Sequence, residues 1–510
     1  MNHRIPAVHV TGCGRPVRGR KQAGPASGAA LDVWRCSKAC PTYSEILARV
    51  YDCTFPPRGD TCCHGEAHRP RQHAHRREQH SADVIASRNL VRVPTGVFML
   101  YQLVEYQRAL LAPFTAWAAS AANAFIDPAS PFAYVPGASC FAAGYEMLYR
   151  LGRTCEKPSF GIITAIRRDG HVIAVAEQVI VEGPFCRLLR FAPDMGALDP
   201  CTAPTPPVLV CAPLAGHHAV MLREVVQALL PEHVVYVTDW NDARRVPVAE
   251  GPFHLDDQVA HLQAFIRRIG AEPLHVLAIC QATVPALAAV SLLASAGEPT
   301  PRSLILVGGP VDARRSPTAL GRLAARHSLA WFQRNLIYAV PQPYPGAGRK
   351  VCPSFLQLAG LAAAQPERLG EAYWDYCLDL VRCDPVRAKE HRRACDAYHA
   401  VLDMAAEFYL DTIQLVFQEF QLARGSWQVR GEAVRPQDIR TTALLTIEGE
   451  QDEISGRGQT QAAHDLCQGI AACDKRHLTA RQCGHYDLFC GPRWCTDVYP
   501  RIRDLTGHDT

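Results

Sequence analysis

One cysteine stands where a strand-like run meets a helix-like run, and its position suits a nucleophile. Residues 274–279 are mostly apolar, residues 281–296 are rich in small side chains, and Cys280 lies at the junction. This layout is typical of a nucleophile elbow, a strained turn that lifts a reactive side chain out of a sheet. The motif here is Ala278-Ile-Cys-Gln-Ala282, with alanine where the usual G-x-S-x-G pattern has glycine. Cys280 is therefore the candidate nucleophile.

A nucleophile of this kind needs a general base, and the base needs an acid that orients it. Where an elbow carries the nucleophile, the acid and then the histidine follow later in the chain. A strand-like run at 441–447 leads into a loop with Asp452, and a second run at 475–480 is followed by His485. The order predicts a triad of Cys280, Asp452 and His485.

Other side chains compete for two of these roles. The alternatives for the acid share the loop of Asp452, and they are Glu448, Glu450 and Glu453. The alternatives for the base lie earlier in the chain, and they are His217 and His218. Chain order argues against these two histidines, because the base of an elbow enzyme follows its nucleophile.

Acyl transfer by such a triad passes through an oxyanion that needs two N–H donors. One donor is expected to be the backbone N–H of Gln281, the residue after the nucleophile. The second should come from the loop after the strand-like run at 208–211. Pro213 has no N–H, so Leu214 is the candidate.

Four segments of the chain resemble the intracellular polyhydroxyalkanoate (polyhydroxybutyrate) depolymerases. They are residues 99–113, 143–152, 278–285 and 449–456, within a resemblance that covers about residues 99–505. The resemblance implies an α/β-hydrolase fold and a Cys-Asp-His triad at the three positions named above. It also implies hydrolysis of amorphous storage-polyester granules in the cytoplasm through a cysteine acyl-enzyme, with release of 3-hydroxybutyrate and oligomers and with no cofactor.

Two other functions stay open at this point. The family is related to the polyester synthases, which also use cysteine, so a synthase-like acyltransferase is the alternative reading. Coenzyme A is an alternative acyl acceptor to water. A granule-surface protein without catalysis is a third hypothesis, but the ordered triad speaks against it. The sequence does not fix the oligomeric state or the preferred monomer length.

The elements that must position these residues begin with helices. Apolar residues recur at helical spacing after Met99, and we expect Tyr101, Leu103, Tyr106, Leu110 and Phe114 to form a core-facing stripe. Runs rich in β-branched residues then predict an antiparallel start to a sheet. These runs cover residues 162–166, 171–181 and 186–191.

Strand and helix patterns alternate from residue 208 to 307, which predicts a mostly parallel, doubly wound sheet with its ligands at the carboxyl ends of the strands. The alternation stops at Gly308 and resumes near residue 441. The intervening stretch is helix-like and rich in aromatic residues, and we expect it to form a lid. The predicted fold class is α/β: an α/β-hydrolase fold with a helical and antiparallel N-terminal extension and a large helical lid. The predicted units are 1–98, 99–310, 311–438 (the lid) and 439–510.

The first 98 residues differ from the rest in charge. They contain 15 Lys and Arg against 7 Asp and Glu, a balance of 15 − 7 = +8, whereas the whole 510-residue chain has a net charge of +4. They lack periodicity, which predicts a disordered or wrongly assigned extension ahead of Met99. The ligand-type residues of this extension show no paired zinc-finger spacing, so neither a metal site nor nucleic-acid binding is expected; they are Cys36, Cys40, Cys62, Cys63, His64 and His68.

The amino-acid composition indicates where in the cell the protein is expected. Hydrophobic residues make up 48% and charged residues 20% of the chain, as in ordinary globular proteins. We expect no membrane span and no secretory signal, because no long uncharged apolar run stands out. The 21 cysteines are then best read as reduced thiols of a cytoplasmic enzyme.

Overall fold

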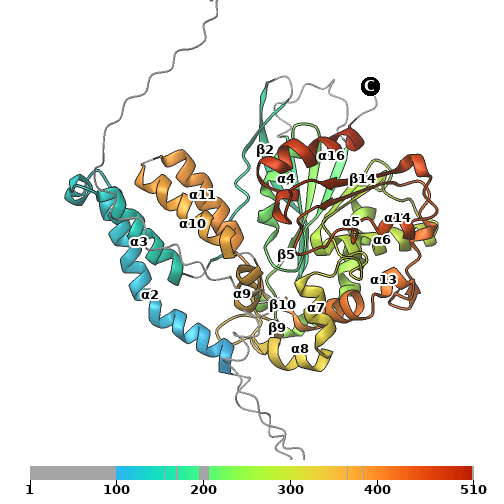
Figure 1. Cartoon of the computed structure of the whole chain (residues 1–510), viewed down its shortest axis with the longest axis horizontal. Helices are drawn as coiled ribbons and strands as arrows, with labels where there is room; N and C mark the ends of the chain where they lie inside the picture. The colour runs from blue at the N-terminus through green and yellow to red at the C-terminus, as the bar shows by residue number, and fades with distance from the viewer. Residues whose placement is uncertain are drawn as a thin grey trace, which may run out of the picture.

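A nine-stranded sheet forms the centre of the protein (Figure 1). The computed structural model describes residues 99–153, 155–167, 170–193, 206–364, 366–382 and 384–507. The extension predicted at 1–98 lies outside the described residues. In space the strands run β1-β2-β3-β5-β4-β6-β7-β13-β14. Their bounds are β1 Thr164–Ile166, β2 Val172–Glu182, β3 Cys186–Pro193, β4 Pro207–Cys211, β5 Val234–Trp240, β6 His275–Ile279, β7 Ser303–Val307, β13 Ala443–Gly449 and β14 Lys475–Ala480.

The sheet has an antiparallel part and a parallel part. Neighbouring strands from β1 to β5 pair antiparallel, and the remaining pairs, from β5 through β4, β6, β7 and β13 to β14, are parallel. Every residue of β6 and β7 is buried, which explains their near-continuous apolar sequences, since parallel strands are covered on both faces. The predicted α/β-hydrolase fold is confirmed.

Helices cover the sheet and connect its parallel strands. Helix α5, Leu255–Ile269, is followed by Gly270 and has two aspartates in its first turn and two arginines in its last, the arrangement that the helix dipole favours. Helix α6 is buried almost throughout and carries no charge, because it packs directly behind β6. The main helices are α4 Arg223–Leu229, α5 Leu255–Ile269, α6 Thr283–Ser295 and α16 Tyr499–Thr506.

The stretch between β7 and β13 is mostly helical, as expected, but it also contains five short strands. Three of them, β8 Tyr338–Ala339, β9 Lys350–Cys352 and β10 Met404–Ala405, form a small antiparallel sheet, and β11 Gln428–Val429 pairs with β12 Glu432–Ala433. The helices are α7 Ala319–Arg326, α8 Leu329–Leu336, α9 Ser354–Ala364, α10 Pro366–Val381, α11 Pro385–His399, α12 Ala406–Asp411 and α13 Gln421–Arg424. The unit boundaries proposed from the sequence stay predictions.

The first two helices of the described residues form a hairpin at one side of the molecule, next to α10 and α11 (Figure 1). These helices are α2 Met99–Ile126 and α3 Ala138–Gly152. Small side chains of α2, including Ala118 and Ala122, are buried, whereas many large apolar ones face solvent. The expectation of a core-facing stripe is wrong except at Tyr101, since Leu103, Tyr106, Leu110 and Phe114 are all exposed. Helical spacing identifies an apolar stripe but not what covers it.

One described helix, Leu100–Ile126, is long and apolar enough to cross a membrane, judged by length and composition alone. Only 17% of its most apolar 18-residue window is buried. The sequence-based expectation overlooked this stretch because Thr, Ser and Asn interrupt the apolar residues. The absence of a membrane span stays a prediction.

Candidate active site

The turn at Cys280 has the strained backbone that a nucleophile elbow requires. Cys280 follows β6 directly and has φ = 55°, a left-handed conformation that is uncommon for a residue with a side chain. Ala278 and Ala282, two residues before and after it, are both buried, at the positions where an elbow usually has glycine. The Thr283 hydroxyl donates to the Cys280 carbonyl oxygen at 2.8 Å and closes the turn. The half-buried thiol opens into a cavity.

The loops after β13 and β14 bring Asp452 and His485 together. Asp452 Oδ2 accepts a hydrogen bond from His485 Nδ1 at 2.8 Å, and both side chains are almost fully buried. The other carboxylate oxygen, Oδ1, accepts from the backbone N–H groups of Ile454 at 2.9 Å and Ser455 at 2.7 Å. With both oxygens held, Asp452 fixes the ring of His485 and leaves its Nε2 for Cys280.

The charges around His485 favour its protonated form. Burial by itself lowers the pKa of this imidazole, but the charges of Asp452 and Cys280 and hydrogen bonds to both side chains raise it well above the usual range. The structure thus brings the three residues of the predicted triad together. In such an arrangement a histidine can take the proton of a thiol and keep it beside the resulting thiolate.

A glycine turn after β7 supports this arrangement. Gly308 has φ = +58°, and a Cβ there would lie 3.4 Å from Asp452 Oδ2 and 3.4 Å from His485 Cε1. At Gly309 a Cβ would lie 1.7 Å from the Thr283 hydroxyl. A larger residue at either position would push on the candidate site, which explains the glycine pair that ends the strand pattern in the sequence.

Two of the three competing acids are held elsewhere. Glu448 accepts from the backbone N–H of Gly458 at 2.9 Å, and Glu450 accepts from that of Gln482 at 3.0 Å. Glu453 lines the cavity. Of the four carboxylates in this segment, the described structure places only Asp452 in a hydrogen bond with His485.

The competing bases also line the cavity, but their electrostatics differ from those of His485. Burial lowers the pKa of His217 to about 4 and that of His218 to about 3. His217 Nε2 lies 2.8 Å from the Tyr486 hydroxyl. Both histidines are therefore neutral at physiological pH, and the charge of Asp239, which raises the pKa of His218, does not offset its burial.

The two candidate oxyanion donors are close together, and one of them already has an acceptor. The N–H of Gln281 lies in the first helical turn after the nucleophile, where it has no acceptor within the helix. The N–H of Leu214 donates to the Gln281 side chain, with its nitrogen 3.2 Å from Oε1. An oxyanion at this position would have to replace that amide oxygen, so the role of Leu214 stays a prediction.

Side chains that the sequence did not suggest organise this loop. Gln258 Oε1 accepts from Gln281 Nε2 at 2.8 Å, and Gln357 Oε1 accepts from the Gly216 N–H at 3.2 Å. The N–H of Ala215, which also lines the cavity, has no hydrogen-bond partner within the described residues. Ala215 is thus a second candidate donor. No sequence pattern distinguishes Gln258 and Gln357 from other glutamines, because their hydrogen-bond partners are far away in the chain.

The segment 400–405 joins the loop to the rest of the insertion. The N–H of His218 donates to the Ala400 carbonyl and that of Leu402 to the Gly216 carbonyl, each at 3.1 Å. Asp403, in the same segment, accepts from the Tyr101 hydroxyl at 2.5 Å. The loop beside the nucleophile is therefore connected through one short segment to the first turn of α2.

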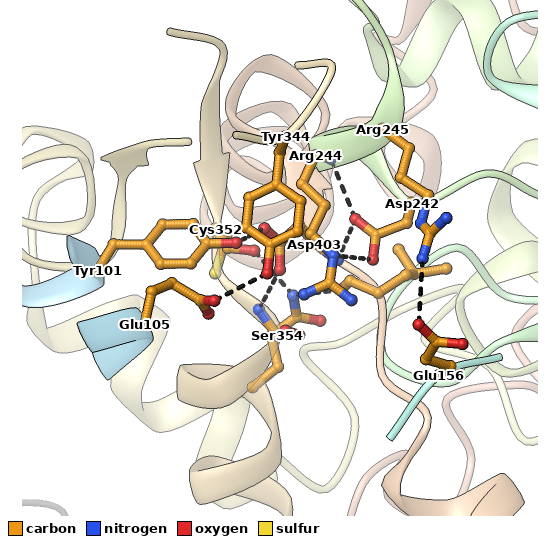
Figure 2. A network of polar contacts seen from close by, with 12 residues as sticks. Tyr101, Glu105, Glu156, Asp242, Arg244, Arg245, Tyr344, Cys352, Ser354 and Asp403 are labelled. Atoms are coloured by element: carbon orange, nitrogen blue, oxygen red, sulfur yellow. Dashed lines mark hydrogen bonds and ion pairs between the residues drawn. The ribbon is translucent and has the colours of Figure 1, made fainter. Parts of the chain in front are cut away.

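Figure 2 shows the polar network around Asp403. Asp403 Oδ1 accepts from the Ser354 N–H at 2.7 Å, and the Asp403 N–H donates to Asp242 at 3.3 Å. Arg244 Nε lies 2.9 Å from Asp242. Burial and the nearby charge of Asp403 raise the pKa of Asp242 to about 7, although Arg244 opposes this rise.

A cavity of about 280 Å³ opens in front of the candidate triad. Its floor carries Cys280, Gln281 and His485, and about half of its lining residues come from the predicted lid. Several wall residues are large and apolar, among them Leu320, Leu323, Leu336, Leu356, Leu361, Met404, Phe408, Tyr409, Ile413 and Phe417. The site thus suits an apolar substrate with a small polar group at the floor. No group of His, Cys, Asp or Glu side chains able to hold a metal ion occurs among the residues that the structure describes.

Residues 308–509 match the family model described as the C-terminus of the PHB depolymerases. The C-terminal part of the chain is therefore similar to that family. The matched segment includes Asp452 and His485 and begins after the cysteine elbow, so it covers less than half of the chain. This match supports hydrolysis of an ester. The search of curated proteins gave no match.

Solved structures with a similar arrangement have low sequence identity. One is 2-hydroxy-6-oxo-6-phenylhexa-2,4-dienoate hydrolase from Rhodococcus sp. strain RHA1, at 14% identity and a TM-score of 0.35, covering 65% of this chain and 99% of that one. Another is a hydrolase from Pseudomonas aeruginosa PA01, at 14% identity and a TM-score of 0.36, covering 66% and 98%. Similarity at this level carries no argument about function.

Proposed function

We propose that this protein is an intracellular depolymerase that hydrolyses the ester bonds of amorphous poly(3-hydroxybutyrate) or a related polyhydroxyalkanoate. The observation that supports this most is the buried pair of Asp452 and His485 beside the Cys280 elbow, at the floor of an apolar cavity. The family match supports the same substrate class. The proposed location is the cytoplasm, at the surface of storage granules.

The proposed reaction begins with proton transfer from the Cys280 thiol to His485 Nε2. The thiolate attacks the ester carbonyl carbon, and the oxyanion accepts hydrogen bonds from the N–H of Gln281 and from that of Leu214 or Ala215. When the tetrahedral intermediate collapses, the carbon–oxygen bond breaks and the departing alkoxide takes the proton from His485. The products of this half-reaction are a thioester on Cys280 and a hydroxyl-ended chain.

Water completes the proposed cycle. His485 takes one proton from the water as its oxygen attacks the thioester carbonyl, and Asp452 stabilises the charged ring during both half-reactions. The carbon–sulfur bond then breaks, and the Cys280 thiolate recovers the proton from His485. The released product is a carboxylic acid, either 3-hydroxybutyrate or a short oligomer. Coenzyme A would replace water if its thiol reached the same thioester.

The reaction direction is tested with purified protein and protein-free amorphous granules. We expect loss of granule mass and release of 3-hydroxybutyrate or oligomers, with no release by the Cys280→Ala variant. Crystalline polymer should react slowly, because its chains are not free to enter a covered cavity. Adding coenzyme A and assaying 3-hydroxybutyryl-CoA distinguishes the two acyl acceptors. Formation of high polymer from 3-hydroxybutyryl-CoA, without granule loss, would favour the synthase alternative.

A further inference from the structure

Helix α2 has an unusual distribution of side chains for a helix on the outside of a soluble protein. Five large apolar residues lie on one face at intervals of three or four, and all are exposed; they are Leu103, Tyr106, Leu110, Phe114 and Trp117. Tyr106 and Leu110 are 62% and 61% exposed. We call these five residues the hairpin surface. Three small residues of the helix, Thr115, Ala118 and Ala122, are buried instead.

The contact between α2 and α3 explains why the hairpin surface stays uncovered. Thr115 packs so closely on Gly152 of α3 that a Cβ there would lie 2.3 Å from the threonine methyl carbon. The two helices therefore meet partly through small residues. Trp117 contacts the Tyr145 ring of α3 at 5.3 Å and the Phe114 ring at 5.6 Å, but all five residues of the hairpin surface stay about half exposed or more. Exposed apolar patches of this kind mark contacts with another apolar body.

We propose that the hairpin surface docks the protein on the amorphous, uncharged polyester that its active site cleaves, an inference that rests on the proposed function. The charge of the hairpin supports this partner. No Lys or Arg occurs between Arg108 and Arg150, and the acidic residues of that stretch are only Asp127 and Glu146. A helix that binds anionic lipid headgroups usually carries many basic residues, so a polymer without charge fits this surface better.

The length of the hairpin argues for lying on a surface rather than crossing a bilayer. Helix α3 has 15 residues, and crossing the apolar core of a bilayer takes about 20. Arg150 on α3 also forms ion pairs with Glu146 and Asp396, each at 2.9 Å. These buried charges hold α3 against α11 and would have to be separated if the hairpin inserted.

The N-terminal end of α2 contacts the wall of the active-site cavity. The Tyr101 ring lies 5.5 Å from the Phe355 ring on α9, and the next residue of α9, Leu356, lines the cavity. Tyr344 donates to Glu105 of α2 at 2.8 Å, as Figure 2 shows. A hairpin adsorbed on polymer would therefore keep the cavity close to the polymer surface.

The test replaces two exposed residues of the full-length protein. Leu110→Glu with Trp117→Glu places two charges on the hairpin surface, and Ile163→Glu with Val172→Glu places two charges at the exposed β1–β2 edge as a matched control. Binding is measured by co-sedimentation with protein-free amorphous poly(3-hydroxybutyrate) granules. We expect the hairpin variant to bind at least about tenfold more weakly, equivalent to about 1.4 kcal/mol, and the control to bind as the wild type does.

Turnover of a soluble ester, 4-nitrophenyl butyrate, separates docking from catalysis. The hairpin variant should keep wild-type turnover of this ester while granule hydrolysis falls with binding. If circular dichroism shows that this variant is not folded, Leu103→Ser with Tyr106→Ser provides a neutral replacement. Wild-type granule binding by a folded hairpin variant, or an equal loss of binding in the control, would overturn the proposal.

Two further measurements show whether a membrane or a second copy of the chain, and not polymer, covers the hairpin surface. Tighter binding to vesicles of phosphatidylethanolamine and phosphatidylglycerol than to granules would assign the surface to a membrane and overturn the polymer proposal. A wild-type dimer that becomes a monomer in the hairpin variant, with granule binding unchanged, would assign it to a second copy of the chain. Wild-type protein that binds granules through this surface but releases no acid would contradict the proposed function and leave the docking surface standing.

Discussion

At the scale of single residues, the strained turn at Cys280 and the buried pair of Asp452 and His485 carry most of the proposed chemistry. The elbow motif predicted Cys280, and chain order then predicted Asp452 and His485, because an elbow restricts where its partners can follow. The second oxyanion donor was harder to predict. The bond between the Leu214 N–H and Gln281 Oε1 depends on the reach of a side chain 67 residues away, which no local pattern encodes.

Replacing Asp452 by asparagine should lower kcat without unfolding the protein. The amide keeps the shape but cannot stabilise a charged imidazole, and comparable changes in other triads cost on the order of ten-thousandfold in kcat. The measurement is hydrolysis of a soluble ester, with thermal unfolding as the check on folding. Glu450→Gln is the matched control, because Glu450 lies in the same loop without a bond to His485. Near-normal turnover by Asp452→Asn would remove Asp452 from the triad.

Cys280 should also react with iodoacetamide faster than the exposed thiols at pH 6. An ordinary cysteine is almost wholly protonated there and alkylates slowly, whereas a thiol paired with a protonated histidine stays reactive. Peptide mapping would compare Cys280 with Cys140, Cys473 and Cys495, which are more exposed. His485→Ala should slow labelling of Cys280 alone. Labelling that follows exposure would mean that Cys280 and His485 do not act as a pair.

At the scale of elements, the strands around the site were predicted closely because each is a short apolar run next to a turn. Strand β7, Ser303–Val307, ends where the predicted alternation stops, and β13 is shifted by two residues from the predicted 441–447. The spatial order of the strands was not predicted, since pairing depends on contacts between distant segments. The exposed stripe of α2 was missed for the same reason, because burial depends on the neighbour and not on the helix itself.

The network around Asp242 should make stability depend on pH. The pKa of Asp242 is about 7 in the folded protein, above the value of about 3.9 for an unfolded chain. Between about pH 4 and pH 7 the folded state therefore holds a proton that the unfolded state has lost. The stabilisation from this proton is complete below about pH 4 and disappears as pH rises through 7. The free energy of unfolding should fall by up to about 1.4 kcal/mol per pH unit across this window.

Asp242→Asn should remove the part of the pH dependence of the unfolding free energy that comes from Asp242. Chemical unfolding of both proteins at several pH values between 4 and 8 gives the comparison, and His485 contributes equally to the two curves. Asp312→Asn is a control. Burial raises the pKa of this carboxyl, but hydrogen bonds to Arg314 and the charge of Arg314 outweigh burial and lower it. Parallel curves for the wild type and Asp242→Asn would show that Asp403 or another member of the network binds the proton.

At the scale of the whole molecule, the fold, the site and the hairpin all lie within residues that begin at Met99. The basic residues 1–98 differ from this part in charge and lack its periodicity. A chain that starts at Met99 should therefore fold and keep full turnover of both soluble ester and granules. Loss of solubility or of activity in the shortened chain would show that the first 98 residues take part in folding or in substrate contact.

The fastening of α2 to the cavity wall through Tyr101 and Asp403 has a kinetic consequence. Because the hairpin surface and the active-site cavity are rigidly connected, an adsorbed enzyme hydrolyses only the polymer chains exposed at the granule surface beneath it. Its velocity should follow the total area of the suspension and not the mass of ester that the particles enclose. Equal masses of small and large granules would then be consumed at rates in the ratio of their areas, and the rate would saturate once the boundary is crowded with enzyme.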